Sequence, residues 1–155
     1  MYLEGNSQEW VNYRLQAKVN LVSGNVIGLW FRGTYEDVGS SGRRFTGYYC
    51  TINPDRNRVT LSRIRLEDEC ATPPCKYAYD FRNPLQLTQV TQDLYRNRWY
   101  TLKVEVQGSL IKCYVDDVLK IEYNDTVSGF LQGTVGFYVY KAGDARFDDV
   151  LVQPL

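Results

Sequence analysis

The sequence contains no histidine, a single methionine and no excess of charge of either sign. Among its 155 residues, 18 lysines and arginines balance 18 aspartates and glutamates. The absence of histidine excludes Ser-His-Asp and Cys-His catalysis and removes the commonest side-chain ligand of transition metals. The balanced charge provides no general attraction to nucleic acid or to anionic membranes. We therefore expect neither a nucleic-acid-binding protein nor a histidine-dependent enzyme.

The chain also lacks an apolar run that approaches the ~20 residues of a membrane-spanning helix, so we expect no membrane insertion. Its opening residues, Met1 to Gly5, do not resemble a secretory signal. A length of 155 residues suffices for one domain with a substantial core. We predict a single domain over residues 1–155, cut from a longer secreted or cell-surface protein in which it is fused to a catalytic or surface domain.

Tyrosine and short alternating segments are what the sequence has in abundance. It contains 13 tyrosines, and apolar residues alternate with polar ones between closely spaced turn signals. No long stretch has helical periodicity. About ten short strands joined by polar turns predict an all-β fold, a two-sheet antiparallel β-sandwich of the jelly-roll type.

Three of the predicted strands place aromatic and basic side chains on the side away from the core. Successive side chains of a strand point to opposite faces. In residues 26–32, 46–53 and 135–140 one parity is apolar and predicted to be buried: Ile27, Leu29, Phe31, Tyr48, Cys50, Ile52, Val135, Phe137 and Val139. The other parity is predicted to stand in solvent and includes Trp30, Arg32, Tyr49, Tyr138 and Tyr140.

A group of exposed rings in one area is typical of a binding surface. Rings beside hydrogen-bonding side chains suit a sugar, which has apolar C–H faces and hydroxyl edges. The strands predicted over residues 13–21, 99–107 and 110–115 expose mainly charged and amide side chains instead. We predict that these strands form a solvated sheet and that the ring-bearing strands lie side by side in the other sheet.

The four cysteines fall into two groups. Cys70 and Cys75 flank a short loop with two prolines, which favours a disulfide over free thiols and hence an oxidising, extracytoplasmic location. Cys50 and Cys113 have the inward parity of their strands, so two buried free thiols and a bridge across the core remain equal alternatives. Zinc is disfavoured because the cysteines lack paired short spacings.

Several motifs along nearly the whole chain resemble a known superfamily. They are Trp10–Leu15, Gly28–Arg32, Gly47–Tyr49, Trp99–Gly108, Tyr114–Asp117, Gly133–Phe137 and Ala145–Val152. In this order they resemble the concanavalin A-like, laminin-G-like jelly-roll superfamily, nearest to levan-type carbohydrate-binding modules and the 3-keto-disaccharide hydrolase domain family. The resemblance implies a concanavalin A-like jelly roll, often appended to secreted carbohydrate-active enzymes, with a bound structural calcium ion in many members.

The last predicted strand contains a fault in its alternation. Phe147 and Val150 both have apolar side chains but lie an odd number of residues apart. An extra residue at Asp148-Asp149, a β-bulge, restores the inward pattern. By analogy with the superfamily, Asp148 or Asp149 is a candidate calcium ligand, and turn chemistry is the alternative interpretation.

These observations favour a non-catalytic carbohydrate-binding module that docks a polysaccharide or oligosaccharide. The rings of Trp30, Tyr49, Tyr138 and Tyr140 are predicted to contact the glycan, and Arg32 and Arg63 to bind its hydroxyls. The alternatives are that residues 33–44 cover Trp30 and that the arginines pair with Glu67 or Glu69.

Two other functions are weighed against this one. A laminin-G-like adhesive module would present the same face to a protein. A glycoside-cleaving enzyme is disfavoured because the predicted face carries no closely spaced pair of carboxylates.

Overall fold

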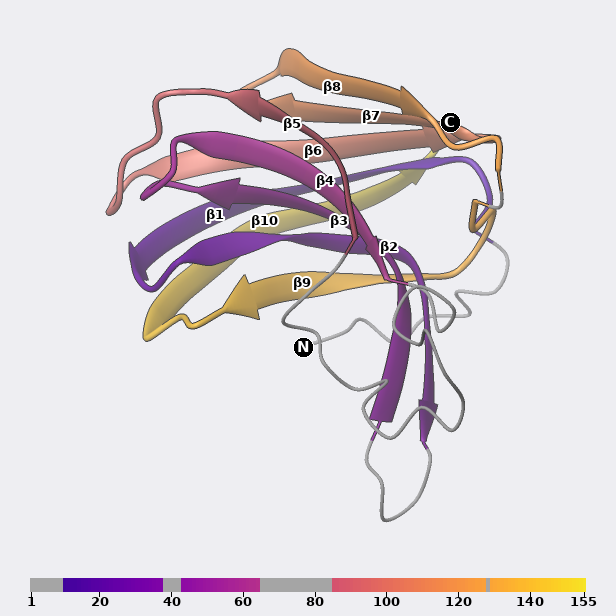
Figure 1. Cartoon of the computed structure of the whole chain (residues 1–155), viewed down its shortest axis with the longest axis horizontal. Helices are drawn as coiled ribbons and strands as arrows, with labels where there is room; N and C mark the ends of the chain where they lie inside the picture. The colour runs from indigo at the N-terminus through magenta and orange to yellow at the C-terminus, as the bar shows by residue number, and fades with distance from the viewer. Residues whose placement is uncertain (1–9, 38–42, 65–84, 128) are drawn as a thin grey trace.

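The computed structural model describes residues 10–37, 43–64, 85–127 and 129–155, which form strands and turns (Figure 1). None of these described residues belongs to a helix that is long and apolar enough to span a membrane. The strands are β1 (Tyr13–Ser23), β2 (Val26–Asp37), β3 (Arg43–Asn53), β4 (Arg58–Ile64), β5 (Leu85–Thr91), β6 (Trp99–Gln107), β7 (Leu110–Val115), β8 (Val118–Asn124), β9 (Thr134–Tyr140) and β10 (Asp144–Pro154).

The strands form two five-stranded antiparallel sheets that pack face to face (Figure 1). One sheet has the order β10-β1-β6-β7-β8 and the other has the order β5-β4-β3-β2-β9. We call them the back sheet and the front sheet. The predicted antiparallel sandwich is confirmed. So is the separation of strands, because β2, β3 and β9 are neighbours in the front sheet and β1, β6 and β7 are neighbours in the back sheet.

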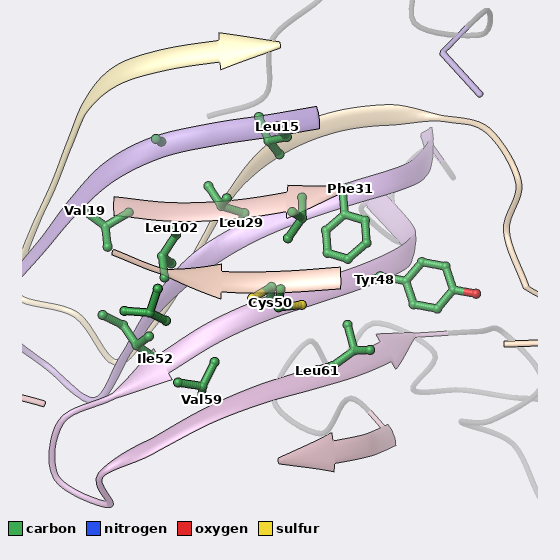
Figure 2. Close-up of a cluster of buried hydrophobic side chains, with 14 of the residues drawn as sticks. Leu15, Val19, Leu29, Phe31, Tyr48, Cys50, Ile52, Val59, Leu61 and Leu102 are labelled. Atoms are coloured by element: carbon green, nitrogen blue, oxygen red, sulfur yellow. The ribbon is translucent and has the colours of Figure 1, made fainter. Parts of the chain in front are cut away.

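Alternate side chains from the two sheets fill the core between them. Leu15, Val19 and Leu102 of the back sheet meet Leu29 and Phe31 of the front sheet (Figure 2). Burial of each such side chain stabilises the fold by about 1.5–3 kcal/mol. The predicted inward parity of β2 and β3 is therefore confirmed over residues 27–31 and 48–52.

The edge strand β9 departs from the predicted pattern at one residue. Val135 is buried and Phe137 packs against the core, but 47% of the Val139 surface is exposed. The prediction that Val139 is buried is wrong. Because β9 is the last strand of the front sheet, it has no further neighbour to cover its outer end.

Cys50 and Cys113 both lie in the core as free thiols. Cys50 belongs to β3 and Cys113 to β7, so the two residues come from opposite sheets. Burial and a hydrogen bond with Cys50 raise the pKa of the Cys113 thiol well above its ordinary value. The predicted inward orientation of both cysteines is confirmed, and of the two alternatives the structure shows free thiols rather than a disulfide across the core. Cys70, Cys75, Glu67 and Glu69 lie outside the described residues.

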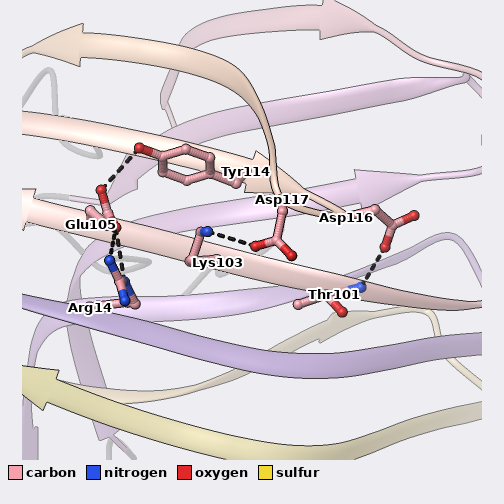
Figure 3. Close-up of polar contacts among 7 residues, drawn as sticks. All are labelled: Arg14, Thr101, Lys103, Glu105, Tyr114, Asp116 and Asp117. Atoms are coloured by element: carbon pink, nitrogen blue, oxygen red, sulfur yellow. Dashed lines mark hydrogen bonds and ion pairs between the residues drawn. The ribbon is translucent and has the colours of Figure 1, made fainter.

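On the outer face of the back sheet, polar side chains pair with one another (Figure 3). Arg14 Nε donates to Glu105 Oε1 over 2.8 Å, and the Tyr114 hydroxyl donates to Glu105 Oε2 over 2.9 Å. Burial raises the pKa of Glu105, but these hydrogen bonds outweigh burial and hold it below the ordinary value. Lys103 Nζ lies 2.7 Å from Asp117 Oδ1. The predicted solvated face is confirmed.

An extra residue in β2 changes the direction of its side chains after Phe31. Trp30 pairs with Gly136 and Gly33 with Thr134, so three steps along β2 match two along β9. Arg32 occupies this bulge with a φ of 48°. Its backbone N–H, which leaves the ladder, donates to the Tyr13 hydroxyl over 2.9 Å. The bulge turns the Arg32 side chain to the interior, whereas strict alternation places it in solvent.

The guanidinium of Arg32 joins three loops at the end of the sandwich. Nη1 donates to the carbonyl oxygens of Gly108 over 2.6 Å and Phe130 over 3.2 Å, and Nη2 donates to that of Val11 over 2.7 Å. Only 1% of its surface is exposed. Burial lowers the pKa of the guanidinium, although arginine stays charged. The prediction that Arg32 faces solvent is therefore wrong.

Arg63 lies on the core side of β4 rather than on its outer face. Arg63 Nη1 lies 2.8 Å from Asp125 Oδ2, which also accepts a hydrogen bond from the Tyr48 hydroxyl over 2.7 Å. All three residues are buried. Burial raises the pKa of Asp125, but the bonds from Tyr48 and Arg63 outweigh it and lower the pKa overall. This buried polar cluster ties β4 and β3 to the segment after β8.

The bulge predicted in the last strand is present. Gln16 pairs with Leu151 and Lys18 with Asp148, so β10 contains an extra residue, and Asp149 has a φ of 49°. The Asp149 carboxylate forms an ion pair with Lys18, and Asp148 accepts a hydrogen bond from the Asp149 backbone N–H. Calcium requires six to eight oxygens, and no group of three or more acidic, cysteine or histidine side chains converges among the described residues. The calcium site stays a prediction.

The Arg63–Asp125 pair makes stability depend on acid pH. A carboxyl whose pKa is depressed by folding contributes stability above its unfolded pKa of about 3.9, and this contribution is lost as pH falls through the folded pKa. We expect the free energy of unfolding of the wild-type chain, measured by urea titration, to fall more steeply below about pH 4 than that of Asp125→Asn.

At pH 7 Asp125→Asn leaves the buried Arg63 charge without its carboxylate and should lower the free energy of unfolding by about 3 kcal/mol. Asp55→Asn is the matched control, because Asp55 pairs with Arg96 at the surface. The control should change stability by less than about 1 kcal/mol. Equal acid slopes for wild type and Asp125→Asn would contradict the assignment.

Candidate functional site

A groove of about 330 Å³ lies on the outer face of the front sheet. It crosses all five strands of the sheet, from β9 at one edge to β5 at the other. Its lining consists of rings, small polar side chains, amides and guanidinium groups: Val26, Tyr49, Thr51, Asn53, Arg56, Arg58, Thr60, Ser62, Gln86, Gln89, Tyr138 and Tyr140.

The groove is hollow because small residues meet in the middle of the sheet. One row of paired residues runs from Tyr138 on β9 through Gly28, Thr51 and Thr60 to Gln89 on β5. Outward side chains of neighbouring strands lie next to one another along such a row. Short side chains therefore form the floor, and the longer ones at the two ends of the row form the walls.

Tyrosine rings form the wall on the β9 side. Tyr49 and Tyr138 pack edge to face with ring centroids 4.6 Å apart. Tyr138 and Tyr140 are half-buried and two residues apart on β9, so they point to the same face. Tyr49 has the predicted outward parity, but the prediction that it stands in solvent is wrong, because only 3% of its surface is exposed where it borders the groove. Tyr138 and Tyr140 offer apolar surface and phenolic hydroxyls to a molecule in the groove, and Tyr49 packs behind Tyr138.

Amide and guanidinium groups form the opposite wall. Arg58 Nη1 donates to Gln89 Oε1 over 3.1 Å, which orients the guanidinium across β4 and β5. Arg56 lies in the turn before β4, and Gln86 lies on β5. The groove thus presents many hydrogen-bond donors and acceptors on the side away from the rings.

Sequence reasoning found one wall and missed the other. Tyr49, Tyr138 and Tyr140 line the groove together, whereas Arg63 lies on the other face of the sheet and Arg32 is buried at its end. Arg58 and Arg63 are five positions apart on one strand, so they point to opposite faces. The alternation in β4 is the sequence signal that could have identified Arg58 as a groove residue, because Arg58, Thr60 and Ser62 share the outward parity.

Trp30 has the predicted outward parity but is covered, with only 4% of its surface exposed. The prediction that it stands in solvent is wrong. Its ring meets Phe45 edge to face at 5.6 Å, and Nε1 donates to the Thr46 carbonyl over 2.9 Å. Trp30, Tyr49 and Ile64 form a small apolar cluster outside the main core, against which Phe45 and Tyr138 pack. Trp30 thus supports the tyrosine wall from beside the groove.

Two glycines make room for the Trp30 indole. A Cβ added to Gly33 would lie 2.0 Å from Trp30 Cζ2, and one added to Gly47 would lie 2.8 Å from Trp30 Nε1. Both distances are far below van der Waals contact. The indole therefore lies directly over the backbone at the β2 bulge, where β2 and β3 continue beyond the sandwich as a paired ribbon (Figure 1).

Comparison with protein families gives one match over nearly the whole chain. The model of the 3-keto-alpha-glucoside-1,2-lyase-like domain matches residues 5–153. No curated protein matches the chain.

Solved structures with similar folds include a carbohydrate-binding module and galectins. The carbohydrate-binding module CBM66 from Bacillus subtilis has a TM-score of 0.69 and 21% identity, covering 93% of this chain and 76% of that chain. Galectin LEC-6 from Caenorhabditis elegans has a TM-score of 0.59 and 11% identity, covering 99% and 88%. Sheep galectin-11, in complex with glycerol, has a TM-score of 0.56 and 13% identity, covering 99% and 93%. These likenesses establish the shared jelly-roll fold.

Because Trp30 is a packed residue, its removal should affect folding first. Trp30→Ala deletes the centre of the outer cluster and should lower the free energy of unfolding by about 3–5 kcal/mol in urea titrations. Tyr140→Ala is the matched control, since Tyr140 is half-buried at the groove and should cost less than about 1.5 kcal/mol. A Trp30→Ala protein as stable as the wild type would show that the indole does not pack as described.

Proposed function

We propose that this chain, which belongs to the family of 3-keto-alpha-glucoside-1,2-lyase-like domains, binds carbohydrate in the groove of the front sheet. The observation that carries the proposal is the pairing of two unlike walls across a floor of small residues. Tyr49, Tyr138 and Tyr140 form one wall, and Arg58, Gln86 and Gln89 belong to the other.

The two walls match the two kinds of surface that a sugar presents. The C–H face of a pyranose or furanose ring packs against an aromatic ring, and its hydroxyls exchange hydrogen bonds with amides, hydroxyls and guanidinium groups. Each ring contact contributes about 0.5–1.5 kcal/mol beyond area burial. The groove crosses all five strands of the front sheet, so it suits a segment within a polysaccharide as well as a free oligosaccharide.

The proposed role is docking without cleavage. Hydrolysis of a glycoside uses two carboxyl groups on either side of the scissile bond. The described residues that line the groove include no aspartate or glutamate. Similarity in fold to a carbohydrate-binding module and to galectins agrees with this role by analogy.

Lyase activity is a second candidate function, favoured by the description of the matching family. Elimination across C1 and C2 of a 3-keto glucoside removes the C2 proton, which the neighbouring carbonyl makes acidic. This step needs a general base within hydrogen-bond reach. The described lining of the groove offers hydroxyls, amides and guanidinium groups, and no carboxylate, lysine or histidine. We therefore rank binding above elimination.

We extend the proposal to a secreted or cell-surface location, with the domain carried by a longer protein. The support is the close spacing of Cys70 and Cys75, which suits a disulfide in an oxidising compartment. In such a protein the domain would hold a linked catalytic or surface domain against a polysaccharide.

Ring removal tests the binding site directly. We expect Tyr138→Ala and Tyr140→Ala each to weaken binding about three- to tenfold, because each loses one ring contact. The measurement is affinity electrophoresis through gels that contain fructan, β-glucan, xylan, galactan or polygalacturonate. Tyr95→Ala is the matched control, since Tyr95 is 60% exposed and lies outside the groove.

Thermal unfolding of each variant separates loss of a contact from loss of the fold. A well-folded Tyr138→Ala, Tyr140→Ala double variant that binds as tightly as the wild type would overturn the site. Failure of the wild type to bind any of the polymers would overturn the function.

The lyase candidate has its own measurement. Incubation of the chain with an aryl 3-keto-glucoside should release no aryl alcohol above the rate in buffer, because the described lining of the groove has no carboxylate, lysine or histidine to act as the base. Release that exceeds the buffer rate and disappears on substitution of an acidic residue would favour elimination over docking.

A further inference from the structure

We infer that the groove prefers an anionic polysaccharide, one whose sugars carry carboxylate or sulfate groups. The inference rests on the proposed carbohydrate-binding function and names the class of ligand. It starts from an imbalance of charge in the groove of a chain that has none overall. The described lining contains two guanidinium groups, those of Arg56 and Arg58, and no carboxylate.

These two arginines differ from the other arginines whose side chains the structure describes. Five of the others form ion pairs with carboxylates: Arg14, Arg63, Arg96, Arg98 and Arg146. Arg32 is bound by three carbonyl oxygens instead. Within the described part of the chain, Arg56 and Arg58 have no carboxylate partner, so their charge is directed to the groove and to solvent.

The carboxylate next to them in the sequence is already engaged. Asp55 precedes Arg56, but both of its oxygens accept hydrogen bonds from Arg96 Nη2, over 2.6 and 2.7 Å. Arg96 therefore holds this negative charge in a pair of its own. The nearest residue to neutralise Arg56 or Arg58 along the chain is thus occupied elsewhere.

Arg58 is also held in place for a ligand. Its Nη1 donates to Gln89 Oε1 over 3.1 Å, which uses one of its five N–H donors. The remaining donors of the planar fork suit the bidentate geometry of a carboxylate or sulfate. A neutral sugar would offer only hydroxyls at this position, and such hydrogen bonds are weaker than charge-assisted ones.

The rings and the Arg58 guanidinium come from different strands of the groove, with the rings on β3 and β9 and Arg58 on β4. Tyr138 and Gln89, the residue that holds Arg58, are at opposite ends of a row that crosses five strands. At about 4.8 Å per strand, the backbone separation along the sheet is roughly 19 Å. A ligand that reaches from Tyr138 to Gln89 would therefore contain more than one sugar, with its anionic group displaced from the stacked ring.

The test uses ligands that differ only in charge. Polygalacturonate is compared with its carboxyl-reduced form, and dextran sulfate with dextran, by affinity electrophoresis or calorimetry at low and high salt. We expect at least one anionic polymer to bind about tenfold more tightly than its neutral partner, since charge-assisted hydrogen bonds are stronger. The difference should shrink in high salt because the groove is open to screening. Preference within one pair identifies carboxylate or sulfate as the group recognised.

Charge removal at the groove supplies the matched variants. Arg56→Gln and Arg58→Gln should weaken binding of the anionic polymer more than binding of its neutral partner, so the preference for the anionic polymer should shrink. Arg146→Gln is the control, because it removes the same charge from β10 in the back sheet. The control should preserve the preference.

Each result separates this inference from the proposed function. Equal binding of the charged and neutral polymers, with loss in Tyr138→Ala, overturns the anionic preference and keeps the carbohydrate site. An equal effect of Arg58→Gln and Arg146→Gln overturns the role of Arg58. No binding of any polymer overturns the proposed function and the inference together.

Discussion

The bulge in β2 is the constraint on which the rest of the front sheet depends. It places one extra residue between Trp30 and Gly33 and holds Arg32 in a left-handed conformation. Such a conformation costs a non-glycine residue on the order of 1–3 kcal/mol. The Tyr13 hydroxyl accepts the freed backbone N–H, and three carbonyl oxygens accept from the guanidinium. These bonds offset the cost and lock the bulge.

The bulge also directs two neighbouring side chains, those of Trp30 and Arg32, to opposite faces of the front sheet. On the core side of the sheet, the Arg32 side chain closes one end of the core by joining loops that are distant in the sequence. On the outer face of the sheet, the indole of Trp30 lies on the backbone of Gly33 and packs against Tyr49. Tyr49 in turn meets Tyr138 at the groove. A local change of backbone direction thus makes a rigid support for the aromatic wall.

Arginine has two opposite uses in this fold. Arg32 and Arg63 are buried and bind groups of the protein itself, so they stabilise the end of the sandwich. Arg56 and Arg58 lie in the open groove and keep donors available. The buried pair costs desolvation that its hydrogen bonds must compensate. The groove pair pays little desolvation before a ligand arrives, which leaves more of its interaction energy for binding.

Alternation along each strand was enough to predict the sandwich, the two sheets and the face that carries Tyr49, Tyr138 and Tyr140. It also located the bulge at Asp148-Asp149, because apolar residues on both sides shift phase there. At Arg32 no apolar residue marks the shift, so the pattern predicted the wrong face. Trp30 is buried because Phe45 packs against its ring and because Gly47 has no side chain to displace the indole. Both residues lie on β3. The direction in which a side chain points follows from its own backbone, and the alternation of apolar and polar residues along the strand reflects that direction. Its exposure and its partners depend on segments that only folding brings near.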